Sequence, residues 1–78
     1  MKAEEYVNRE RSRSSVSEKL FSLLLEVTDD LENLCGIFAD LQTDEERQLL
    51  IDYIEKGEDV NEEQLILNSI WIAQQNDH

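Results

Sequence analysis

The sequence predicts an all-α fold, and three observations indicate it. The 78 residues include no proline and only two glycines, so the residues that tight β-hairpin turns need are scarce. Hydrophobic residues make up 40% of the chain, which is too high for a wholly disordered protein. Three segments carry helix-capping residues ahead of apolar residues at helical spacing. We therefore expect a small three-helix bundle, or a helical hairpin packed on a long N-terminal helix, with a polar N-terminal tail.

Residues 1–14 are predicted to form a flexible or short-helical tail ahead of a single acidic helical domain over residues 15–78. The second half of this tail alternates arginine, glutamate and serine, and it offers no apolar side chain to bury. Burial of apolar surface is what offsets the entropy lost when a segment becomes ordered. Tyr6 and Val7 are the only residues expected to anchor the tail.

The clearest helix pattern lies over residues 16–41. Ser15 and Glu18 fit a capping box at its start, in which each side chain bonds the backbone N–H of the other residue. Apolar residues then recur with spacings that alternate between four and three, as in a heptad repeat. The members of this seam are Leu20, Leu24, Val27, Leu31, Leu34, Phe38 and Leu41. Leu31 stands in the middle of the seam, so we expect it to be among the most buried side chains.

The second helix is predicted over residues 44–56. Thr43 and Glu46 form another capping box at its start. Gly57 suits the left-handed backbone position that commonly follows a helix end. We expect this helix to stop at that glycine.

The third helix is predicted over residues 62–74, with Asn61 and Gln64 as its capping box. Only Asn68 and Ser69 are polar between residues 65 and 73, and a helix that is apolar nearly all round is normally buried on every side. A unit of this size cannot enclose one of its own helices. Part of this surface should therefore meet a partner chain. The β-branched residues of this run leave a short strand as the alternative.

Charge is distributed unevenly along the chain. Residues 1–19 hold five basic side chains against four acidic ones, whereas residues 20–78 hold fifteen acidic side chains against two basic ones. Such a surplus repels nucleic acid and anionic membranes, and it attracts basic protein surfaces. We therefore predict a protein partner with a basic surface, with no direct nucleic-acid binding and no membrane binding.

No pattern in the sequence indicates catalysis, a cofactor or a metal site. The only histidine, His78, is the last residue, where a mobile chain end cannot hold a general base in place. Cys35 has no histidine near it in sequence, so we expect a structural thiol. One cysteine cannot form an internal disulfide, and no apolar run is long enough to span a bilayer. These features predict a soluble cytoplasmic protein that is not an enzyme.

One candidate binding surface consists of acidic residues expected on exposed helix faces. They are Glu26, Asp29, Asp40, Asp44, Glu45, Asp52 and Glu55. Acids three or four residues apart on a helix stand about 5–6 Å from each other, a spacing comparable to that of nucleic-acid phosphates. Such a row would occupy the nucleic-acid groove of a basic target, and small acidic inhibitors encoded by phages and mobile elements are similar in size and charge. The alternative is that these acids only keep the domain in solution.

A second candidate surface is apolar and consists of Leu67, Ile70 and Trp71 on the third helix. Together with the seam of the first helix, it exceeds what one 78-residue chain can cover, so we predict a homodimer. The predicted function is that of a non-catalytic regulatory or inhibitory protein, which acts by binding another protein. The alternative is a structural homo-oligomer, or a subunit of a hetero-complex, assembled through apolar helical faces.

Overall fold

The computed structural model describes residues 2–57 and 60–75, and His78 lies outside them. Within the described residues the regular structure consists of five helices: α1 (Ala3–Arg11), α2 (Ser15–Leu25), α3 (Leu31–Asp40), α4 (Asp44–Lys56) and α5 (Glu62–Gln75). The described part of the chain contains no strand. The predicted all-α class is therefore confirmed, and the third predicted helix is a helix and not the alternative strand.

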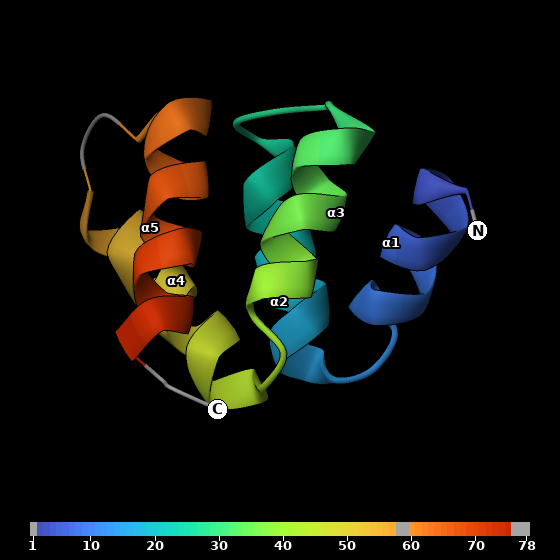
Figure 1. Cartoon of the computed structure of the whole chain (residues 1–78), viewed down its shortest axis with the longest axis horizontal. Coiled ribbons are helices and arrows are strands. Elements are labelled where there is room, and N and C mark those ends of the chain that lie inside the picture. The colour runs from blue at the N-terminus through green and yellow to red at the C-terminus, as the bar shows by residue number, and fades with distance from the viewer. Residues whose placement is uncertain (1, 58–59, 76–78) are drawn as a thin grey trace.

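The helices pack into a bundle that measures 31 × 28 × 21 Å. Helix α1 lies at one side of the molecule and α5 at the other, with α2 and α3 between them (Figure 1). Helix α1 packs on α2 and α3, α2 packs on α4, and α5 packs on both α3 and α4. Every helix contributes to one core, which consists of Val7, Leu20, Phe21, Leu24, Leu34, Ile37, Phe38, Leu41, Leu50, Ile51, Leu65 and Ile72.

The predicted tail contains α1, so its short-helical alternative is the one found over Ala3–Arg11. Val7 is buried in the common core, which ties this helix to the rest of the bundle. Arg11 adds a two-armed ion pair to Glu18 of α2, with N···O distances of 2.7 and 3.0 Å. Its guanidinium also lies 4.0 Å from the centre of the Phe21 ring, an attractive cation–π contact.

The prediction of one long helix over residues 16–41 is wrong, because the chain turns at residues 26–30 between α2 and α3. Thr28 Oγ1 accepts a hydrogen bond from the Asp30 N–H at 3.1 Å, and the Asp30 carboxylate accepts two N–H bonds from the first turn of α3. Such side-chain bonds compete with continuation of a helix. Leu31 becomes the first residue of α3 and is 40% exposed, which contradicts its predicted burial.

The cap at the start of α2 also differs from the prediction. Ser14 is the N-cap, and its hydroxyl oxygen accepts a hydrogen bond from the Ser17 N–H at 3.0 Å. The predicted capping box of Ser15 and Glu18 does not form. The Glu18 carboxylate is engaged by α1 instead, so a tertiary contact replaces the local one.

The other two predicted capping boxes are confirmed. In α4 the Thr43 hydroxyl oxygen accepts from the Glu46 N–H at 3.2 Å, and the Glu46 carboxylate accepts from the Thr43 N–H at 3.1 Å. At α5 the same reciprocal pair joins Asn61 and Gln64, at 2.9 and 3.2 Å. Both pairs lie within four consecutive residues, which is why the sequence alone reveals them.

Gly57 ends α4 as predicted, but its backbone is extended, with φ −78°, and not left-handed. Position 57 takes a glycine because there is no room for a Cβ atom. A Cβ at this position would overlap the Val60 side chain and would stand 3.2 Å from the Tyr53 carbonyl oxygen. Glycine therefore lets the Val60 side chain lie close to the end of the helix.

A buried arginine joins four of the helices. Arg47 of α4 is 1% exposed, and all three of its guanidinium nitrogens donate hydrogen bonds. Nε donates to the Leu41 carbonyl at 2.6 Å, and Nη2 donates to the Glu10 carboxylate at 2.6 Å and to the Phe38 carbonyl at 3.2 Å. Nη1 donates to the hydroxyl of Ser17, which is itself buried. This cluster fixes α1, α2 and the end of α3 against α4.

The acid side of this cluster has a depressed pKa. Burial acts to raise the pKa of Glu10, but the hydrogen bonds and positive charges of Arg47 and Arg13 outweigh it and bring the pKa below the usual carboxyl range. A carboxyl group of this kind stabilises the fold above its unfolded pKa of about 4.3. That contribution is lost as the pH falls through the lower, folded-state pKa.

Glu10→Gln should therefore lower the free energy of unfolding at pH 7, and the gap to wild type should close as the pH falls below about 4. The reason is that a protonated Glu10 and a glutamine are both neutral partners for Arg47. Urea denaturation of both proteins at a series of pH values measures the gap. A gap that stays constant down to pH 3 would contradict the assigned ion pair.

Candidate protein-binding surface

Four large apolar side chains remain exposed on α4 and α5, and we call them the apolar patch. They are Leu49 at 49%, Leu67 at 57%, Ile70 at 40% and Trp71 at 58% exposure. The opposite side of α5 supplies Leu65, Ser69 and Ile72 to the interior. Helix α5 thus has apolar residues on both its inner and its outer side, as the sequence predicts, and the outer ones are left in water.

Two hollows shape the patch, and Trp71 and Asn68 line both of them. The first hollow, of about 290 Å³, lies between the two helices and is also lined by Leu49, Asp52, Tyr53 and Lys56 of α4. The second, of about 410 Å³, lies along α5 and is completed by Leu67. The surface is therefore shallowly indented along α5 and between α4 and α5.

The spacing of the lining residues explains the first hollow. On α4 they stand at positions i, i+3, i+4 and i+7, which form one stripe along a helix. On α5, Asn68 and Trp71 are three residues apart and face that stripe. Ile72 is buried beneath them. The hollow is therefore a groove that follows the boundary between α4 and α5.

The groove is lined by one acidic and one basic side chain, Asp52 and Lys56. Asp52 is partly buried in the groove, and its carboxylate accepts one hydrogen bond from Gln48 Nε2, at 3.0 Å. Within the described residues from position 20 onward, Lys56 is the one basic side chain at the surface, because Arg47 is buried. A ligand of the groove therefore meets one carboxylate and one ammonium group, on a chain whose net charge is −12.

The structure does not bring the predicted acidic residues into one row. Glu26 and Asp29 lie in the turn between α2 and α3, and Asp40 ends α3. The other four, which are Asp44, Glu45, Asp52 and Glu55, lie on α4. The sequence predicts that the row begins along one long helix, but the turn between α2 and α3 interrupts it.

Two of the α4 acids are engaged within the fold. Asp44 accepts a hydrogen bond from the Ser14 hydroxyl at 2.8 Å, and Glu55 forms an exposed ion pair with Lys19 at 3.4 Å. A carboxylate that already has a partner is a weaker imitation of a free phosphate. Glu45 is exposed, while Asp52 alone of the predicted acids lines the groove beside the apolar patch.

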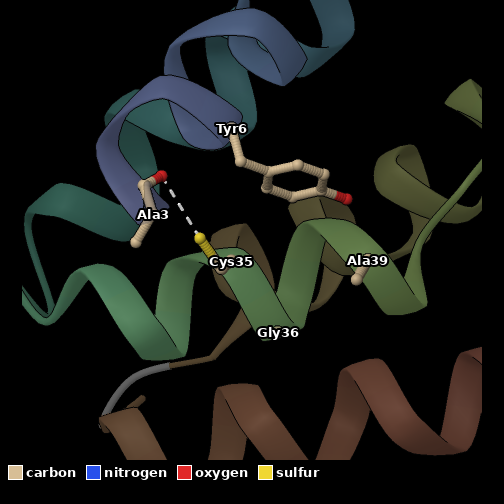
Figure 2. Close-up of a pocket in the computed structure, with 5 residues that line it drawn as sticks. All are labelled: Ala3, Tyr6, Cys35, Gly36 and Ala39. Atoms are coloured by element: carbon tan, nitrogen blue, oxygen red, sulfur yellow. Dashed lines mark hydrogen bonds between the residues drawn. The ribbon is translucent and has the colours of Figure 1, made fainter. Parts of the chain in front are cut away.

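A third hollow, of about 440 Å³, lies between α1 and α3, on the far side of α3 from α5 (Figure 2). It is lined by Ala3, Tyr6, Cys35, Gly36 and Ala39. The Cys35 thiol donates a hydrogen bond to the Ala3 carbonyl at 3.3 Å, so it joins the two helices. Burial, and to a lesser degree the charge of Glu32, raises the pKa of Cys35 and favours the neutral thiol. This environment supports the structural role expected for Cys35.

Residues 2–57 and 60–75 hold no cluster of metal-ligating side chains and no helix suited to span a membrane. No three histidine, cysteine, aspartate or glutamate side chains there lie close enough together to hold a metal ion. None of the described helices has the length and hydropathy to cross a membrane. Comparisons with protein families, with curated proteins and with solved structures found no match to this chain.

Proposed function

We propose that this protein is a non-catalytic protein-binding module of the cytoplasm, which regulates or inhibits a partner that has a basic surface. The contact surface is the apolar patch. The observation that carries the proposal is the exposure of Trp71 and Leu67, each more than half in water, on a helix whose other side is in the core. Exposed apolar patches mark binding sites, and tryptophan is enriched among the residues that dominate binding energy.

Charge supports a basic partner. The chain carries a net charge of −12, and the exposed part of α4 and α5 holds Lys56 as its one basic side chain. Long-range attraction of this kind speeds the encounter with a basic protein, while the apolar contacts supply most of the binding energy once the two surfaces meet. A nucleic-acid-binding protein is one kind of basic target. That narrower form of the proposal rests on the charge alone, since no single phosphate-like row is formed.

A homo-oligomer is the alternative use of the same patch. The exposed Leu67, Ile70 and Trp71 would then be covered by a second copy. Each copy carries a net charge of −12, and this repulsion opposes self-association. Light scattering at high micromolar concentration separates the two uses. A 9.1 kDa species favours a different partner, and a dimer that Trp71→Ser dissociates favours the homo-oligomer.

The combined change Leu67→Ser and Trp71→Ser should lower the amount of captured partner at least about tenfold, because it removes the apolar contacts of the patch. The measurement is affinity capture from the native host with the immobilised chain, followed by identification of the retained proteins. The retained partner should be basic, and its capture should weaken at high salt.

Leu25→Ser provides the matched control for this experiment. Leu25 is 47% exposed, but it lies at the end of α2 and outside the patch. This variant should retain the partner. Equal loss with both variants, or full retention by the patch variant at unchanged helix content, would contradict the proposed surface.

A further inference from the structure

We propose that the groove between α4 and α5 receives an amphipathic helix of the partner, which presents apolar anchors to Leu49 and Trp71 and a lysine or arginine to Asp52. This inference rests on the proposed function and specifies the segment of the partner that binds. It follows from the shape of the groove, from its one partly buried carboxylate and from the composition of α5.

The shape favours a helix. The α4 side of the groove runs from Leu49 to Lys56, and seven residues of helix extend about 10 Å, or two turns. Both walls are helix ridges with residues three and four positions apart, and a third helix fits such a boundary by placing its own ridge between them. A helix that lays its apolar face in a groove of this kind is a common mode of peptide recognition. Trp71 and Leu49 are the large exposed apolar side chains of the groove.

The carboxylate of Asp52 sets the charge of the ligand. Its one described hydrogen bond comes from the neutral amide of Gln48. An apolar ligand that covered the groove would strip water from this carboxylate, which is costly unless a positive group pairs with it. No ion pair joins Asp52 to Lys56 within the described residues, so a lysine or arginine of the ligand would supply the positive group that the carboxylate lacks. Lys56, one turn further along the stripe, disfavours a second positive group at that end of the groove.

A second copy of the chain does not meet this requirement through α5. Helix α5 contains no lysine or arginine, so its apolar outer face would cover the groove and leave Asp52 without a cation. Its first turn would instead add the acidic Glu62 and Glu63. Charge complementarity therefore favours a basic helix of another protein over self-association.

Trp71 reports directly on the groove, because it is the only tryptophan in the chain and is largely in water. The probe is a synthetic, tryptophan-free helical peptide of about 15 residues, with leucines at i, i+3, i+4 and i+7 and lysines beside them. Titration should shift Trp71 emission to shorter wavelength and saturate in the micromolar range. A peptide with the same composition in shuffled order, and one with glutamate in place of lysine, should not produce the shift.

Asp52→Asn should weaken peptide binding about tenfold, the effect expected when a charge-assisted hydrogen bond is lost. Glu55→Gln is the matched control, because Glu55 is an acid of the same helix that pairs with Lys19 and does not line the groove. It should leave the affinity within about twofold of wild type. Equal binding of the shuffled peptide, or an unchanged affinity of Asp52→Asn, would overturn the inference. The inference would also be overturned if Trp71 emission shifted when the chain alone was concentrated and the peptide could not reverse that self-association.

The outcomes separate this inference from the proposed function. If the patch variant loses its captured partner but no peptide binds in a charge-dependent way, the proposed function stands and the inference fails. If the lysine peptide shifts Trp71 emission but the patch variant captures the partner as well as wild type does, the groove still binds basic helices and the proposed function fails.

Discussion

Arg47→Ala should lower the free energy of unfolding by about 3–5 kcal/mol, a large fraction of the stability of a domain this small. The substitution removes the Arg47 donor from the Phe38 and Leu41 carbonyls and from the buried Ser17 hydroxyl, which keeps the Ser14 hydroxyl as a partner. It also leaves Glu10 without its main partner and opens a cavity between four helices. Urea or thermal denaturation, followed by circular dichroism, measures the loss.

Two further variants identify the cause of this loss. Arg47→Met, made together with Glu10→Gln, should cost less than the two single changes added, because it removes both charged partners and keeps the volume filled. Arg11→Ala removes the exposed pair to Glu18 and the contact with the Phe21 ring, and it should cost much less than Arg47→Ala because water screens the pair. A loss below about 1 kcal/mol for Arg47→Ala would show that the buried cluster does not hold the helices together.

The residues at which α4 and α5 begin are predictable from the sequence, because the capping signals are local. The capping pair of Thr43 and Glu46 lies within a single turn, and the pair of Asn61 and Gln64 does so as well. Both partners of such a pair come from one turn of helix, so the pair forms unless a tertiary contact engages one of them, as Arg11 engages Glu18. The boundaries of these two helices therefore follow from a few consecutive residues.

Local residues also indicate the turn between α2 and α3, but the longer heptad pattern of apolar residues predicts a continuous helix there. Val27, Thr28, Asp29 and Asp30 have low helix propensity, and Asp30 is a good N-cap. The apolar spacing of α2 continues in register into α3 across this turn, so the heptad pattern indicates one helix where there are two. Periodicity shows which residues face a core, and caps show where a helix ends.

The role of Arg47 depends on tertiary structure. Its position three and four residues before the buried Leu50 and Ile51 places it on the inner stripe of α4. The sequence offers no way to choose its partners, since Glu10 and Ser17 are 37 and 30 residues away. A buried arginine is recognisable only when the elements that satisfy its donors are in place.

The α5 part of the candidate surface is predictable from the sequence. The excess of apolar residues on α5 predicts that some stay uncovered, and Leu67, Ile70 and Trp71 are exposed. Their role in binding stays a prediction. Leu49 and Asp52 join them only because α4 and α5 pack side by side, an arrangement that depends on the whole bundle. The sequence indicates the excess of apolar residues on α5, while the α4 residues that complete the groove are known only from the fold.

Leu34→Ala should lower the free energy of unfolding by about 2–5 kcal/mol, whereas Leu31→Ala should cost less than about 1 kcal/mol. The two leucines lie three residues apart on α3, and the same atoms are removed in both cases. Leu34 is 0% exposed in the core, so its truncation leaves a cavity, while Leu31 is 40% exposed at the start of the helix. Chemical denaturation of both variants measures the difference. Equal losses would mean that the chain does not turn at residues 26–30, because a continuous helix would bury both leucines in one seam.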